Sequence, residues 1–102
     1  YEFRNAGNDQ AIHKAALGGY PEVVRLLLEA GADINSPGQA GAAPLTWAAI
    51  TGQRNTARYL LDSGAEIDTR DEDGLTALHW ATMNNHLSLV CELLDRKADK
   101  SI

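Results

Sequence analysis

A period of 33 residues runs through this chain and constrains its fold more than any other feature. The segment AIHKAALGGYPEVVRLLLEAGADIN at 11–35 aligns with PLTWAAITGQRNTARYLLDSGAEID at 44–68, and a third copy begins at Ala77. Aligned positions keep their character, since Leu27 corresponds to Leu60 and Leu93. Nearly all 102 residues belong to the copies. A chain of this kind is expected to stack similar units that share one core.

Each copy has the pattern of a helix pair. A short segment such as AIHKAA, PLTWAA or ALHWAT comes first, and its alanines allow helices to pack closely. The longer segment PEVVRLLLEA follows, with Pro21 suited to the first helical turn and Val23, Leu26 and Leu27 predicted on one helical face.

The longer helices are predicted to end at Gly31 and Gly64. Both glycines follow the last apolar turn, where glycine accepts the left-handed conformation that closes a helix. The tails ADINS and AEIDTRDEDG contain turn formers and no helical period, so they are predicted to form hairpin-like loops.

The 33-residue unit, with GLTALHWA at 74–81 and LLLEAGADIN at 26–35, resembles the ankyrin repeat over roughly residues 5 to 102. The resemblance implies an all-α solenoid of three helix-turn-helix repeats with hairpin-like loops between them, in a single domain. The repeats are expected at about 5–37, 38–70 and 71–102. Because the sequence starts at Tyr1 and stops abruptly, it is also expected to be a segment of a longer protein.

Several residues depart from the ankyrin pattern. Asn8 stands in place of the turn glycine, Gln10 and Ala43 in place of the threonine that begins the short helix, and Lys97 in place of the helix-ending glycine. Glu92 occupies a position that is apolar or aromatic in the earlier copies, which is consistent with a polar terminal face. The sequence leaves open whether the third copy is a true cap.

Composition narrows the classes of partner. A net charge of −5 argues against nucleic acids and anionic membranes, which bind clustered Lys and Arg. The longest apolar runs fall far short of the roughly 18 residues of a membrane span, so no membrane insertion is expected. The single cysteine, Cys91, forms no internal disulfide, which favours a reducing intracellular compartment, cytoplasm or nucleus.

No residue set indicates catalysis, a metal or a cofactor. His13 and His79 occupy equivalent positions two repeats apart, on the order of 20 Å or more at usual helix spacings, too far to share a zinc ion. Each histidine is expected instead to bond to the turn backbone of its own repeat. Cys91 has no activating base on its helical face and is expected to be exposed and inert. The chain is therefore predicted not to be an enzyme.

A candidate partner site follows from three apolar residues, Leu17, Ile50 and Met83, which recur at the 33-residue period. The resemblance places them at a variable inner-helix position, where they would form an apolar stripe on the concave side, and an exposed stripe usually marks a partner site. The acidic run DEDG at 71–74 could steer a basic partner, although Asp71 and Gly74 are ordinary turn residues. The candidate partner-binding residues are Leu17, Ile50, Met83, Gln39, Ala42, Glu72, Asp73, Leu75, Trp47 and Trp80.

Two of these assignments have structural alternatives. Trp47 and Trp80 occupy one repeat position, where an aromatic side chain also serves as core packing between repeats. The segment LLEAGADIN resembles the pattern in ankyrin repeats that an asparaginyl hydroxylase recognises, with Asn35 as the target. The alternative is that Asn35 only stabilises its turn.

The predicted function is a protein–protein interaction module that binds a partner with a basic and apolar segment through its concave face. Alternatives are a regulatory or targeting domain of a larger enzyme or channel, and a segment that forms homo-oligomers through uncapped ends. No cofactor is expected.

Overall fold

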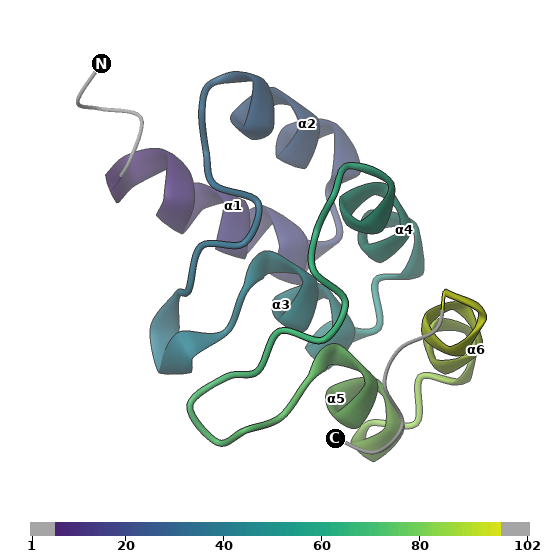
Figure 1. The fold of residues 1–102 in the computed structure, drawn as a ribbon. Helices are drawn as coiled ribbons and strands as arrows, with labels where there is room; N and C mark the ends of the chain where they lie inside the picture. Colours follow the sequence, from purple (N-terminus) through teal and green to yellow (C-terminus); the bar gives the residue numbers. More distant parts are fainter. Residues whose placement is uncertain (1–5, 97–102) are drawn as a thin grey trace.

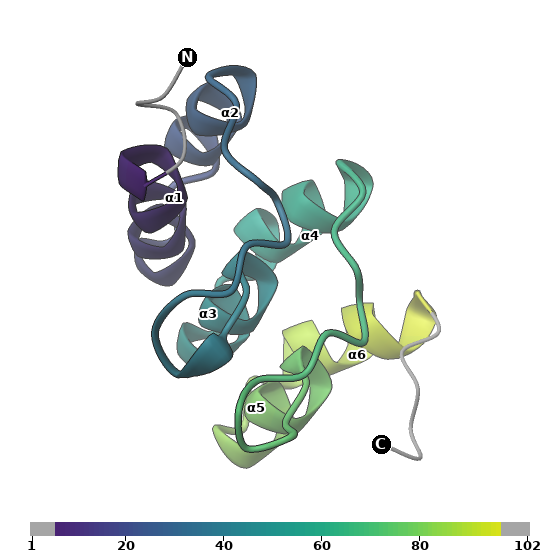
Figure 2. The ribbon, with the colours of Figure 1, turned by 60° about the vertical axis from the view of Figure 1, so that its left-hand side comes forward.

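The structure is a computed structural model that describes the backbone of residues 6–96 and the side chains from Gln10 onward. Over this range it contains three helix pairs (Figure 1): α1 (Ala6–Gly18) with α2 (Pro21–Glu29), α3 (Pro44–Thr51) with α4 (Arg54–Asp62), and α5 (Ala77–Met83) with α6 (Leu87–Asp95). The first helices of the pairs, α1, α3 and α5, stand in one row, and α2, α4 and α6 form a second row beside it (Figure 2). The expected all-helical repeat architecture is confirmed.

The core lies between the two rows and consists mainly of alanine and branched aliphatic side chains. Ala48 and Ala81 are fully buried in the inner row, and Leu60 and Leu93 are fully buried in the outer row. Each helix contacts its equivalent in the neighbouring pair, α1 with α3 and α3 with α5, and α2 with α4 and α4 with α6. The core is therefore continuous along the stack.

The outer helices end as predicted at glycines. Gly31 and Gly64 have φ of 101° and 103°, a conformation that side chains with a Cβ rarely adopt. The N–H of Ala32 donates to the carbonyl of Leu27 at 3.0 Å, and the N–H of Ala65 donates to that of Leu60 at the same distance. These bonds satisfy carbonyls at the helix ends that otherwise lack partners.

The loops between the helix pairs form hairpin-like turns, as predicted. The N–H of Asp71 donates to the carbonyl of Leu75, and that of Gly38 to the carbonyl of Ala42, both at 2.9 Å. The earlier loop contains the short 3-10 turn η2 (Gln39–Gly41). The N–H of Glu72 also donates to the carbonyl of Ala40 at 2.9 Å. The two loops are therefore closed by their own bonds and also fixed to each other.

The start of the first copy differs from the prediction. Asn8 and Gln10 were expected in a turn and at a helix start, but α1 already begins at Ala6 and includes both. In the later loops Gly41 and Gly74 reverse the chain with φ of 72° and 79°. The first copy has Asn8 in the place of that glycine, so no left-handed residue interrupts its helix. Lys97, the expected replacement for a helix-ending glycine, lies outside the described residues.

The predicted apolar face of α2 is only partly correct. Leu27 packs against the core, but Val23 and Leu26 are exposed, and Val24 is the fully buried residue of this helix. Helical periodicity identifies which residues are apolar. Which of them are buried depends on the neighbouring helices, and α1 and α4 cover only one side of α2. The apolar surface of α2 is thus wider than the area that the structure covers.

The sequence position of Glu92 suggested a polar terminal face, but the structure does not place it there. Its side chain is only 13 % exposed and points to the preceding helix pair, 3.4 Å from Arg54 and 3.8 Å from Arg58. Arg96 donates to Glu92 at 2.7 Å and also pairs with Asp62 at 2.8 Å. This ionic network joins α4 to α6.

The network makes the stability of the third helix pair depend on pH. The hydrogen bond from Arg96 lowers the pKa of Glu92; burial opposes this effect, and the bond from Arg54 adds to it. A lowered folded pKa stabilises the protein at neutral pH, and this contribution disappears as the pH falls below the ordinary pKa of glutamate and through the folded value. Glu92→Gln is therefore expected to lower Tm at pH 7, with a difference from wild type that closes on acidification.

Thermal melts of both proteins across a pH series from neutral to acid test this expectation. Other carboxylates titrate in both proteins, so their effects cancel in the difference. A Tm difference that stays constant through the acid range would show that Glu92 does not act through its charge.

Ala43 leaves α3 without a side-chain cap, whereas the equivalent Thr76 caps α5. Thr76 Oγ1 accepts from the N–H of His79, and the His79 ring accepts from the N–H of Thr76. Ala43 has the extended backbone of a capping residue but no acceptor. Ala43→Thr is expected to raise the free energy of unfolding by about 1 kcal/mol, measured by urea denaturation. Ala43→Val is the control, because valine has the shape of threonine without its hydroxyl. This variant should not reproduce the gain.

Candidate functional site

The apolar stripe, Leu17, Ile50 and Met83, lies at the C-terminal ends of α1, α3 and α5. Met83 is 57 % exposed and Leu17 is 37 % exposed, and Ile50 between them is partly exposed. Ile50 is not among the partly buried side chains that pack against the core. The three positions therefore present apolar surface along the inner row without being required for the interior.

Hydrogen bonds between helix pairs fix the backbone of the stripe. Thr51 Oγ1 donates to the carbonyl of Leu17 at 2.7 Å. Asn84 Nδ2 donates to the carbonyl of Ile50 at 2.9 Å, and His86 Nε2 lies 3.1 Å from the same oxygen. Sequence reasoning missed these tethers. The sequence does contain a signal for them, because a polar residue directly follows two stripe positions: Thr51 after Ile50 and Asn84 after Met83.

The two tryptophans lie on the inner helices, between the loops and the stripe in the sequence. Trp47 and Trp80 precede Ile50 and Met83 by three residues, a spacing that places side chains on the same face of a helix. Trp80 Nε1 donates to Asp71 Oδ2 in the adjoining loop at 2.9 Å. Both indoles are half-buried and pack against the core. The bond thus joins the indole of Trp80 to its loop, and both tryptophans pack against the core while remaining partly exposed.

Trp47 lacks the hydrogen bond that Trp80 makes. Its Nε1 is buried with no partner among the described residues. The residue 33 positions before Asp71 is Gly38, which has no carboxylate to accept this bond. A side chain at Gly38 is also disfavoured, because a Cβ there would lie 2.7 Å from the ring of His13.

Asp71 organises the second loop. Its Oδ1 accepts from the N–H of Asp73 at 2.9 Å and of Leu75 at 3.0 Å. Burial raises the pKa of Asp71, but the bonds from Leu75, Trp80 and Asp73 outweigh burial and hold the pKa below its usual value. Asp71 is therefore a structural residue of the turn, as the sequence suggested.

The remaining loop candidates differ in exposure. Gln39, Glu72 and Asp73 are exposed at the loop tips, and Leu75 is partly exposed. Ala42 is only 2 % exposed, so its side chain contributes nothing to this surface and its assignment as a contact residue is wrong. Its buried position follows from the hairpin, in which its carbonyl accepts from Gly38 and its methyl group points inward.

Comparison with protein families identifies the architecture that carries this surface. A family model described as ankyrin repeats, in three copies, matches residues 12–102. The chain belongs to the ankyrin-repeat family. A search of curated proteins found no significant match. Ankyrin repeats are generally protein–protein interaction modules and a non-catalytic fold, and they typically bind protein partners.

The histidines of this ankyrin-repeat chain have structural roles. His79 belongs to the cap of its own repeat, and His13 Nε2 lies 2.7 Å from the carbonyl of Ser36 in the tail that follows α2. His86 differs from the expectation because it contacts Ile50 of the preceding repeat. Among the described side chains, those of residues 10–96, no three His, Cys, Asp or Glu are grouped so that they could hold a metal ion.

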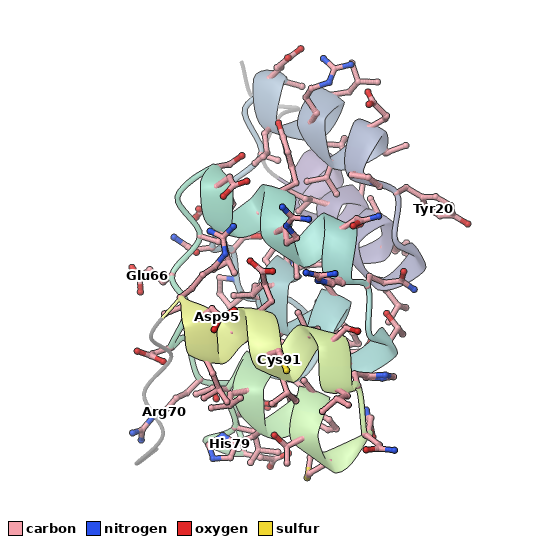
Figure 3. All side chains as sticks on the ribbon, turned by 90° about the vertical axis from the view of Figure 1, so that its right-hand side faces the viewer. Tyr20, Glu66, Arg70, His79, Cys91 and Asp95 are labelled. Carbon is pink, nitrogen blue, oxygen red and sulfur yellow. The ribbon has the colours of Figure 1, made fainter. Side chains whose placement is uncertain are left out.

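Cys91 is a free, exposed thiol on the outward surface of α6 (Figure 3), as expected. A shallow pocket of about 430 Å³ between α2 and α4 is lined by residues that include Arg25, Glu29, Tyr59 and Ser63. It lies on the outer row and includes none of the stripe residues. No helix in the described part of the chain is both long and apolar enough to cross a membrane.

Asn35 links two ankyrin repeats. Its Oδ1 accepts from the N–H of Glu66 at 3.0 Å, and its own N–H donates to Asp33 Oδ1 at 3.0 Å. The side chain therefore joins its turn to the following tail, which gives Asn35 a structural role wider than its own turn. Hydroxylation at this position stays a prediction.

Proposed function

We propose that this ankyrin-repeat chain binds a protein partner through the inner-row surface, with the apolar stripe at its centre. The exposed Leu17 and Met83 and the partly exposed Ile50 support this proposal, because apolar side chains aligned on a surface lose contact with water when a partner covers them. The carbonyl tethers from Thr51 and Asn84 hold the stripe rigid before binding, which reduces the entropy lost on association.

The proposed partner has an apolar segment flanked by basic residues. The exposed carboxylates of Glu72 and Asp73 lie at the loop end of the surface, while Asp71 is occupied by its own turn. Trp47 and Trp80 form the floor between the loops and the stripe and supply aromatic contact area. Contact residues of the loops are Gln39, Glu72, Asp73 and Leu75.

Ile50→Ser is expected to weaken partner binding at least tenfold while changing Tm little. Ile50 lies in the middle of the stripe, and the strongest contributions cluster near the centre of an interface. Burying an isoleucine side chain under a partner contributes roughly 1.5–3 kcal/mol to the binding free energy. A loss of about 1.4 kcal/mol raises Kd tenfold. Because its side chain does not pack against the core, the free energy of folding should be nearly unchanged.

The measurement pairs a binding titration with thermal melts, using a partner first isolated from native extract and then purified. Leu87→Ser is the matched control, since Leu87 is 71 % exposed but lies on α6, outside the surface. Unchanged affinity in Leu17→Ser, Ile50→Ser and Met83→Ser would remove the stripe as the binding site. A large fall in Tm for these variants would assign the residues to the interior instead.

A further inference from the structure

A second apolar surface lies at the N-terminal side of the stack, on α2 and the residue before it. Tyr20 is 59 % exposed, Val23 44 % and Leu26 55 %. Their spacing of three residues places them on one side of α2, and we call them the N-terminal face. Figure 3 shows the Tyr20 side chain projecting from the edge of the molecule.

The equivalent residues of the later repeats are covered. Val23 corresponds to Thr56 and Leu89, and both are only 1 % exposed. Leu26 corresponds to the partly buried Tyr59 and Glu92.

In each later repeat the covering surface belongs to the repeat before it. Glu92, for example, contacts Arg54, and His86 contacts the carbonyl of Ile50. What distinguishes the first repeat is therefore the absence of a covering helix pair from the described part of the chain.

We propose that the N-terminal face is a stacking surface for a further helix pair of the same repeat, carried ahead of α1 on the same polypeptide. The face continues the interface that already joins α2 to α4 and α4 to α6. A terminal surface in contact with water would favour polar side chains at these positions, whereas Tyr20, Val23 and Leu26 have the apolar character of an interface.

Two glycines define the shape that the occupant must have. Gly19 and Gly52 end the inner helices with φ of 78° and 74°, and each lies against a side chain of the next repeat. A Cβ at Gly19 would overlap Gln53, and a Cβ at Gly52 would overlap the ring of His86. Tyr20 occupies the same repeat position as Gln53 and His86. The occupant therefore requires a glycine opposite Tyr20.

The same requirement argues against a second copy of the chain stacked head to tail. At the C-terminal side the position of Gly19 and Gly52 is Asn85, whose φ of 60° keeps the turn but which, unlike glycine, has a side chain. Tyr20 of another copy would meet this side chain instead of a glycine. The stack is thus shaped to be extended at its N-terminal side.

The test fuses a copy of residues 38–70 ahead of residue 5, which keeps the 33-residue register and places the copied Gly52 opposite Tyr20. The fused protein is expected to melt on the order of 5 °C or more above the 102-residue chain. Val23→Glu with Leu26→Glu should abolish this gain in the fusion and leave the Tm of the 102-residue chain nearly unchanged. Gly52→Asn in the copied segment alone should reduce the gain.

Three outcomes would overturn the proposal. The first is a fusion without a higher Tm, and the second is a gain of equal size in the fusion that carries both glutamates. The third comes from sedimentation of the 102-residue chain: a dimer that Val23→Glu with Leu26→Glu dissociates would assign the face to a second copy. None of these measurements involves the stripe, so their result is independent of the proposed function.

Discussion

A fragment ending at residue 68 is expected to be largely unfolded, although it retains two complete helix pairs. Its α3 and α4 lose the cover of α5 and α6, which are their neighbours on that side. The bonds from Asn84 and His86 to the carbonyl of Ile50, and from Arg54 to the carboxylate of Glu92, are lost with them. A small domain is stable by only about 0.05–0.15 kcal/mol per residue, so the loss of one of two interfaces between pairs removes most of that margin.

Far-UV circular dichroism and thermal melts of the 1–68 fragment and the full chain, under identical conditions, measure this effect. The fragment should show a weak helical signal and no cooperative transition. A sharp melt with native-like helicity per residue would contradict the expectation and show that two repeats bury enough apolar surface to fold alone.

Leu60→Ala is expected to lower the free energy of unfolding by about 2–5 kcal/mol. This is the second of the two largest effects that we expect. Leu60 is fully buried in the middle helix pair, and its carbonyl accepts the bond from Ala65 that closes α4. Close packing on both sides leaves little room for neighbours to fill the space of the lost side chain, so a cavity should remain. For a chain of this size Tm should fall by roughly 10 °C or more.

Urea denaturation of the Leu60→Ala variant gives this loss directly. Leu87→Ala is the matched control, because Leu87 is 71 % exposed on the neighbouring outer helix. Its effect should stay within about 0.5 kcal/mol. Equal losses in the two variants would mean that Leu60 is not part of a close-packed interior.

The repeated sequence predicted those features that each copy contains within itself. Gly31 and Gly64 marked two helix ends, and Asp71 and Gly74 marked a turn, because each acts through local backbone geometry. Leu27, Leu60 and Leu93 recur at the 33-residue period, and all three lie at the core, with Leu27 partly buried.

Features that depend on a neighbouring repeat could not be read from one copy. Val23 and Leu89 occupy the same position, yet one is exposed and the other is buried. Leu89 packs behind a preceding helix pair, whereas the described residues place no helix pair before Val23. The carboxylate of Glu92 suggested a terminal face because the arginines that receive it lie 34 and 38 positions away. The side chain of Ala42 is a single methyl group, which is small and apolar enough for either a buried or an exposed position. The sequence alone therefore does not show that it is buried.

The different surroundings of the two indoles give the molecule intrinsic optical reporters. Trp80 donates to a carboxylate, whereas the Trp47 N–H is buried with no partner among the described residues, and the first repeat has Lys14 at this position. Their fluorescence therefore arises from two distinct environments, one in the middle repeat and one in the last. Variants that keep a single indole separate the two signals, so the order in which these repeats lose their structure is observable without any attached dye.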